Sequence, residues 1–142
     1  EFIQRELQKI GLKISIEVMP PSSLKSAKSN GKLDLFRASW VADYPDAQNY
    51  LSLFYSKNFA PNGPNYTHFK NPEFDSWYEK AMQETDTHSR IILYKKMDSL
   101  VIEKAPVVVL FYDEVIRFTL ANVNGLGINP TNLLEVKNVR KN

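Results

Sequence analysis

Two carboxylates, Asp43 and Asp46, stand three residues apart in a short polar segment that follows Trp40. A pair of carboxylates can act as the general acid and general base of a glycosidase. The same residues can also serve local structure, because aspartate is favoured in turns and at the N-cap of a helix. Turn and cap roles explain Asp46 well, and the sequence alone leaves the role of Asp43 open.

Aromatic residues are dense around these aspartates. Tyr50, Phe54 and Tyr55 fall at helical spacing, which is typical of side chains that pack into a core. Trp40 and Tyr44 instead lie at the end of a predicted strand and in the loop that follows it. Ligands of open α/β sheets bind beyond the carboxyl ends of the strands. Trp40 and Tyr44 are therefore candidate ligand contacts, with simple packing as the equal alternative.

The sequence gives little support for metal binding, nucleophilic catalysis or nucleotide binding. The chain has no cysteine and two histidines, His68 and His88, and neither histidine has a second ligand at a recognised metal-binding spacing. The sequence also lacks a nucleophile elbow, a phosphate loop and a dinucleotide-binding motif. We therefore expect no catalytic residue, no metal and no cofactor. Asn65-Tyr66-Thr67 is a formal glycosylation sequon that we attribute to chance.

The composition is that of a globular domain. Of 142 residues, 43% are hydrophobic and 24% are charged, which allows a sizeable core. The net charge is only +2, with both signs mixed along the chain, so a nucleic-acid partner is not expected. No apolar run is long enough to span a membrane.

The first forty residues alternate between helix and strand signals. Apolar residues at helical spacing predict a helix over residues 1–10, which Gly11 ends, and the helix begins without an initiator Met or an N-cap. A strict period of two predicts a strand over 12–18. A short helix over 22–29 and a strand over 33–40 follow. This alternation predicts parallel strands in an α/β sheet.

The rest of the chain is mostly helical until residue 106. Asp46 is the expected N-cap of a helix that carries Tyr50 to Tyr55, and Asn71-Pro72 should begin another helix. A longer helix is expected over 87–104, with Asp86 and Arg90 as an i,i+4 pair near its start. The remaining apolar segments predict strands over 107–120 and 133–139.

Five segments, in this order, resemble the family 5 solute-binding proteins, the oligopeptide- and dipeptide-binding components of ABC importers. Residues 4–14 are similar to the family's Q-x-x-L-x-x-I-G-I-x-V passage from helix to strand. Residues 33–46 resemble its D-L-F … G-W-x-A-D-Y-P-D-P strand and loop. Residues 71–75, 85–94 and 105–111 resemble N-P-E-F-D, T-D-x-x-x-R-x-x-x-Y and A-P-V-I-P-L-Y.

The resemblance implies an α/β fold, as the carboxy-terminal lobe of a type II periplasmic-binding-protein fold with a mixed sheet flanked by helices. Residues 1–120 would form this lobe, with its start truncated within a helix. Residues 121–142 would form a tail strand and the connection toward the other lobe. The two lobes of such proteins close on their ligand by hinge motion.

The resemblance also implies a binding site. In the peptide-binding members, the aspartate that matches Asp43 holds the α-ammonium group of the ligand. Trp40 would line the same cleft, beside Tyr44, and Asn65 and Tyr66 would belong to a second cleft-side loop. The sequence departs from the family at two positions of the first loop, where Ser39 and Ala47 replace a glycine and a proline.

The function implied is that of a binding protein and not of an enzyme. Such a protein is periplasmic or extracytoplasmic, soluble or membrane-anchored as a lipoprotein, and delivers peptides as a monomer to the permease subunits of an ABC importer. A nickel complex or a sugar is the alternative solute within the same transport role. A carboxylate-dependent hydrolase and a structural domain without a ligand are the competing hypotheses.

Overall fold

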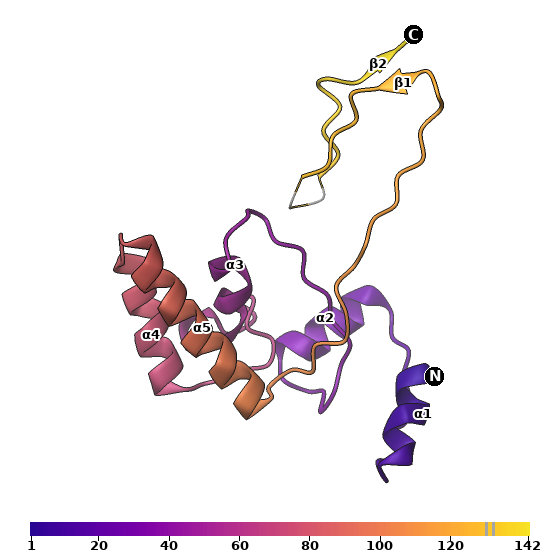
Figure 1. Ribbon diagram of the computed structural model, residues 1–142. Coiled ribbons are helices and arrows are strands. Elements are labelled where there is room, and N and C mark those ends of the chain that lie inside the picture. Colours follow the sequence, from indigo (N-terminus) through magenta and orange to yellow (C-terminus); the bar gives the residue numbers. More distant parts are fainter. Residues whose placement is uncertain (130, 132) are drawn as a thin grey trace.

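The computed structural model describes residues 1–129, 131 and 133–142. Helices α3, α4 and α5 lie together, α2 lies beside this group, α1 lies beyond α2, and an extended segment leads away to the strands β1 and β2 (Figure 1). The elements are α1 (Phe2–Lys9), α2 (Pro21–Ser29), α3 (Gln48–Leu51), the 3-10 turns η1 (Ser52–Phe54) and η2 (Ser56–Asn58), α4 (Pro72–Gln83), α5 (Thr87–Lys104), β1 (Val123–Asn124) and β2 (Arg140–Lys141).

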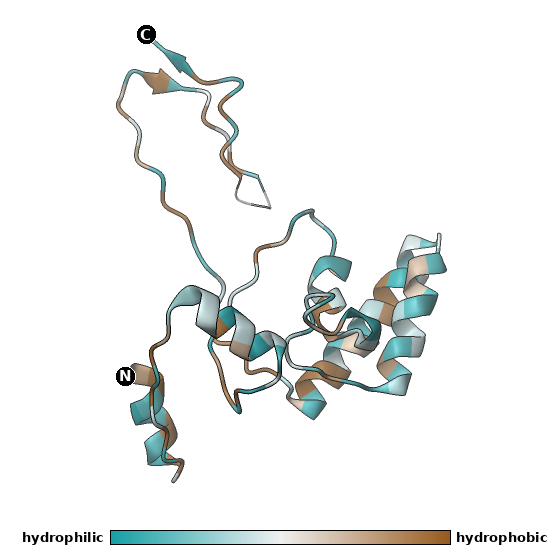
Figure 2. Cartoon of the chain, turned by 180° about the vertical axis from the view of Figure 1, so that it is seen from behind, coloured by the Kyte–Doolittle hydropathy of each residue, from teal (hydrophilic) through white to brown (hydrophobic). Residues whose placement is uncertain are grey.

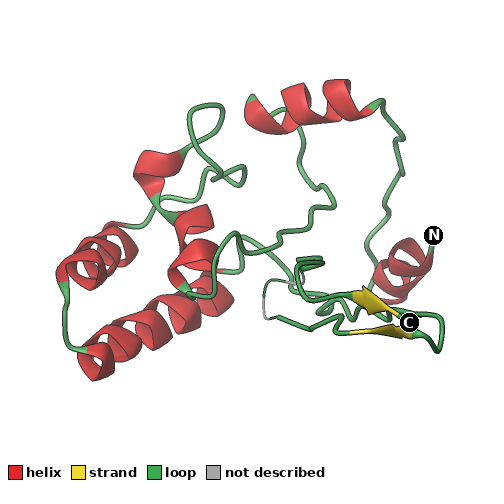
Figure 3. Ribbon diagram, turned by 90° about the horizontal axis from the view of Figure 1, so that it is seen from above, coloured by secondary structure: helices red, strands yellow, loops and turns green. Residues whose placement is uncertain are grey.

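The core lies where α4 packs against α5, and α3 covers one side of this pair (Figure 3). Phe74 of α4 and Met97 of α5 are fully buried at its centre. The Phe74 ring also meets the rings of Phe54 and Phe69 edge-on, at centroid distances of 6.4 and 5.9 Å. These contacts join the irregular segment before α4 to the helical pair. The other buried hydrophobic side chains of the cluster are Leu51, Tyr78, Ala81, Leu100 and Val101.

Four helices begin and end close to the residues that the sequence predicted. Gly11 and Gly31 follow α1 and α2 with φ angles of +86° and +60°, a conformation that favours glycine after a helix. Asn71 caps α4, because its side-chain oxygen accepts hydrogen bonds from the N–H groups of Glu73 and Phe74 at 2.9 and 3.1 Å. Proline occupies the first position of α4, as predicted.

The start of α5 differs from the expected arrangement in one contact. The Asp86 carboxylate accepts a hydrogen bond from the Ser89 N–H at 2.8 Å and so caps the helix. These backbone and side-chain contacts with Ser89 lower the pKa of Asp86. The predicted pair between Asp86 and Arg90 is wrong, because Arg90 turns toward Asp46, at 3.8 Å.

The helix expected from residue 47 is shorter than its aromatic spacing indicated. It ends as α3 at Leu51, and the chain continues through η1 and η2. Tyr55 lies between these two turns in an extended conformation. None of the helices that the structure describes is both long and apolar enough to cross a membrane.

The strands expected over 12–18, 33–40, 107–120 and 133–139 are not formed in the described part of the chain. Besides an isolated parallel bridge between Phe59 and Asn65, the pairing found there is the antiparallel one between β1 and β2, with Val123 opposite Lys141. The alternation of apolar residues predicts which face of a strand would be buried, but a strand also needs a neighbour for its N–H and C=O groups. Residues 107–120 instead run as an extended segment (Figure 2), and most of its apolar side chains are exposed.

We predict that Asn71→Ala destabilises the protein by about 1 kcal/mol, because two N–H groups at the start of α4 lose their acceptor. Equilibrium urea unfolding measures this difference. Asn71→Asp keeps an acceptor oxygen and should retain most of the stability. Equal losses for both variants would contradict the capping role.

Candidate functional site

The segment from Trp40 to Ala47 connects an extended stretch to α3 and carries three of the predicted ligand residues. Polar contacts fasten this segment to the helical core at three points, through Trp40, Tyr44 and Asp46. Asp43 lies between them. We refer to residues 40–47 as the Asp43 loop.

The first contact holds the beginning of the loop. The indole N–H of Trp40 donates to the side-chain oxygen of Asn49 at 2.6 Å, and Asn49 is only 3% exposed. A buried amide that accepts such a bond ties Trp40 to the first turn of α3. The Trp40 side chain remains 37% exposed, so its ring is still accessible at the surface.

The second contact passes through two side chains. The Tyr44 hydroxyl donates to the side-chain oxygen of Gln48, and the Gln48 amide donates to the hydroxyl of Tyr78 on α4. Burial raises the pKa of Tyr78, so this hydroxyl stays protonated at neutral pH. Tyr44 is therefore linked to the core although it is itself exposed.

The third contact is centred on Asp46. One of its oxygens accepts the Gln48 N–H at 2.8 Å, which satisfies a donor at the start of α3. Its other oxygen lies 3.8 Å from the guanidinium group of Arg90 on α5. Burial and a hydrogen bond with Asp46 raise the pKa of Tyr94 to about 12, so Tyr94 serves as a donor near neutral pH. The N-cap of α3 is Ala47 and not Asp46 as predicted, although Asp46, one position earlier, still accepts the Gln48 N–H.

Asp43, unlike Asp46, has no partner within the described part of the chain. Its side chain is exposed, and within the part of the chain that the structure describes it has no hydrogen bond or ion pair. A carboxylate in this situation keeps all its acceptor capacity for another molecule. An ammonium group is a suitable partner, because charge-assisted hydrogen bonds are stronger than neutral ones.

The two aspartates therefore do not form a catalytic pair in this structure. Acid–base catalysis across a glycosidic bond needs two carboxylates that both face the substrate. Asp46 faces Gln48 and Arg90 instead, and its two oxygens are both engaged.

Asn65, predicted to contact a ligand, is fully buried in this structure and forms hydrogen bonds with neighbouring residues of its own segment. Its amide donates to the carbonyl oxygens of Tyr55 and Phe69 at 3.1 and 3.0 Å. Its oxygen accepts from the Thr67 hydroxyl at 3.0 Å and from the Phe69 N–H at 3.3 Å. These four groups belong to Tyr55, Thr67 and Phe69, so all the side-chain hydrogen bonds of Asn65 lie within residues 55–69. Its burial also agrees with a chance sequon.

Tyr66 takes part in a cation–π contact. The Lys28 ammonium group of α2 lies 5.1 Å from the centre of the Tyr66 ring and 5.6 Å from the centre of the Phe36 ring. Such cation–π contacts join α2 to the nearby segment around Phe36 and to the distant segment around Tyr66. The half-buried Tyr66 ring thus has a structural partner in Lys28, apart from the Asp43 loop.

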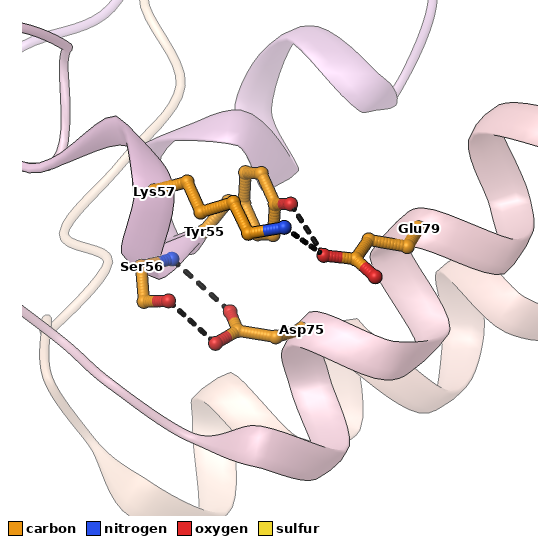
Figure 4. Close-up of polar contacts among 5 residues, drawn as sticks. All are labelled: Tyr55, Ser56, Lys57, Asp75 and Glu79. Carbon is orange, nitrogen blue, oxygen red and sulfur yellow. Dashed lines mark hydrogen bonds and ion pairs between the residues drawn. The ribbon is translucent and has the colours of Figure 1, made fainter.

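A second set of polar contacts fixes η2 to α4 (Figure 4). The Asp75 carboxylate accepts from the N–H and the hydroxyl of Ser56 at 3.0 and 2.5 Å. Glu79 accepts from the Tyr55 hydroxyl and from Lys57, both at 2.7 Å. The hydrogen bond from Lys57 is the main cause that lowers the pKa of Glu79. Sequence analysis missed these pairs, because no local spacing marks partners that are 19 to 24 residues apart.

The described residues hold no group of three or more acidic, histidine or cysteine side chains that could bind a metal ion. Two shallow hollows lie on the surface, one lined by residues 8–15 and the other by residues 19–32. Neither of them is lined by the Asp43 loop.

Comparison with known proteins agrees with the resemblance found in the sequence. Residues 1–62 match the family model described as "Bacterial extracellular solute-binding proteins, family 5 Middle". A di/tripeptide-binding protein of Pseudomonas aeruginosa is 28% identical over 92% of this chain and 24% of its own length. A protein of Escherichia coli named as a probable deoxycholate-binding periplasmic protein is 28% identical over 85% of this chain and 22% of its own length.

A solved structure extends this agreement to the fold. The dipeptide-binding protein of a Pseudoalteromonas species, in complex with Met-Leu, matches 99% of this chain and 28% of its own chain, with 26% identity and a TM-score of 0.75. The predicted resemblance to this family is therefore borne out for residues 1–62, and the predicted periplasmic-binding-protein fold class is confirmed. The chain spans about a quarter of the length of the relatives that it matches.

We predict that Asn65→Ala lowers the free energy of unfolding by about 1–3 kcal/mol, because the Phe69 carbonyl loses its side-chain donor and the Tyr55 carbonyl keeps only the Asn58 N–H. Asn62→Ala, at an exposed position of the same segment, should change it by less than about 0.5 kcal/mol. Urea unfolding of both variants makes this comparison. A stable Asn65→Ala protein that has lost ligand affinity would instead support the predicted direct binding role for Asn65.

Proposed function

We propose that this chain is part of an extracytoplasmic solute-binding protein that captures peptides and delivers them to an ABC importer. The observation that carries this proposal is the unpaired Asp43 carboxylate on a loop held at three points. The similarity to peptide-binding proteins supports it independently. The protein acts by binding and release, without catalysis.

Asp43 is the proposed anchor for the α-ammonium group of a peptide. Its carboxylate is exposed here, and closure of a second lobe over it would remove water from the contact. A charge pair gains strength when water is excluded, provided that both charges are hydrogen-bonded. The three attachments of the loop keep Asp43 in place before the ligand arrives, and so reduce the entropy that is lost on binding.

Trp40 and Tyr44 are the proposed walls of the same site. Both side chains are partly exposed, whereas the Trp40 N–H and the Tyr44 hydroxyl are bonded to the protein. Their rings are therefore free to pack against apolar parts of a ligand. Contacts of this kind tolerate many side chains, as a carrier of varied peptides requires.

The rest of the binding cleft would come from the remaining part of a longer protein, because the relatives are about four times as long as this chain. We propose that residues 1–120 contribute to one lobe and residues 121–142 to the connection with the other. The permease subunits of an ABC importer are the proposed partners, outside the cytoplasm.

A non-peptide solute is the second candidate, because one relative is named for deoxycholate. Such a ligand has no ammonium group and carries a carboxylate, which Asp43 would repel. The free Asp43 carboxylate therefore favours a ligand with an amine.

Native mass spectrometry of the complete protein, purified gently, tests the ligand class. A series of co-purified peptide masses is the expected result. A single non-peptide mass would keep the transport role, but would move the solute to another chemical class and remove the proposed role of Asp43.

We predict that Asp43→Ala weakens the binding of a free-amine peptide by about 2–5 kcal/mol, or roughly 30-fold to several thousand-fold. The loss follows because the ammonium group would enter the closed site without a partner. Isothermal titration calorimetry on the complete protein measures the change. Asp98→Ala, which removes an exposed carboxylate from α5, serves as the control and should bind normally.

We also predict that the 142 residues alone bind peptide poorly or not at all, because one loop cannot enclose a ligand. Titration of the isolated chain beside the complete protein provides the comparison. Equal affinities of the isolated chain and the complete protein would mean that these 142 residues contain the whole site.

A further inference from the structure

We infer that Arg90 on α5 is a positioning residue for ligand binding, which acts by holding Asp46 and thereby fixing the loop that presents Asp43. This inference rests on the proposed function of Asp43. It assigns a role in the binding site to a helix that contributes no predicted ligand contact.

The geometry places Asp46 between the start of α3 and the side of α5. One oxygen binds the N–H of Gln48 at the start of α3, at 2.8 Å, and the other faces Arg90 at 3.8 Å. A change at Arg90 therefore reaches the end of the Asp43 loop through a single side chain. Since Asp43 is three positions away, displacement of Asp46 moves the backbone that carries Asp43.

The surroundings of Arg90 restrict its side chain to this direction. Its guanidinium group lies 5.9 Å from the centre of the Tyr94 ring, one helical turn further along α5. The Arg90 side chain is 37% exposed and that of Asp46 is 32% exposed, so the pair is only partly solvated. Asp86, the expected partner of Arg90, is already engaged at the helix cap.

The ion pair is expected to contribute more to the order of the loop than to global stability. Exposed ion pairs usually add little to the free energy of unfolding. The core around Phe74 and Met97 does not depend on this contact. Removing Arg90 should therefore leave the helices folded while it loosens the loop.

Hydrogen–deuterium exchange on the complete protein tests the first step without any ligand. In Arg90→Gln, backbone amides of residues 41–48 should exchange faster than in the wild type, whereas those of residues 74–82 should not change. Arg90→Lys keeps the positive charge and should restore part of the protection. Lys57→Gln is the matched control, because it removes a positive charge from the ion pair with Glu79. Unchanged exchange of residues 41–48 in Arg90→Gln would overturn the inference.

A double-mutant cycle with a free-amine dipeptide tests the second step. Arg90→Gln should weaken binding about fivefold, in line with the upper values measured for exposed ion pairs. In an Asp43→Asn background the same change should have almost no further effect, because Arg90 acts through Asp43. An equal loss in both backgrounds would overturn the positioning role and indicate a direct contact of Arg90 with the ligand.

The two experiments separate the inference from the proposed function. If the wild type binds no peptide, or Asp43→Asn binds as well as the wild type, the proposed function fails. The exchange measurement would still show whether Arg90 fixes the Asp43 loop.

Discussion

The packing of α4 against α5, around Phe74 and Met97, supports the contacts that hold α3 and the irregular segments next to these helices. Both side chains are fully buried, and the rings of Phe54 and Phe69 meet Phe74 edge-on. Dispersion contacts of this density fix the two helices relative to each other. The polar groups on their surfaces then have constant positions, so irregular segments can be attached to them.

Two irregular segments use this support in different ways. Residues 55–58 are bound to α4 by hydrogen bonds to the carboxylates of Asp75 and Glu79. The Asp43 loop is held by Asn49, by Gln48 with Tyr78, and by Arg90. A loop held in this way can keep an unpaired carboxylate exposed in a defined place. This is the property that the proposed capture of a peptide ammonium group requires.

The extended apolar segments have no such support in the described part of the chain. Phe118 and Val18 are 92% and 90% exposed, although their sequences have the character of buried strands. Exposed apolar surface of this extent usually marks a contact with another surface. The relatives are about four times as long as this chain, which is consistent with a sheet completed by residues outside it.

The sequence by itself determined the features that depend on neighbouring residues. Helix starts at Asn71 and Asp86 follow from side chains that cap the N–H groups next to them, and the ordered motifs were sufficient to indicate the similarity to the family. The candidate residues Trp40, Asp43 and Tyr44 could be named for the same reason, because they share one short loop.

Tertiary structure alone decided which distant groups meet. Arg90 binds Asp46 rather than Asp86, and Asn65 is a buried hydrogen-bonding centre of residues 55–69. Strand formation was also decided at this level, because side-chain alternation fixes the faces of a strand but cannot supply the neighbouring strand. Local spacing carries no information about partners brought together by the packing of α3, α4 and α5.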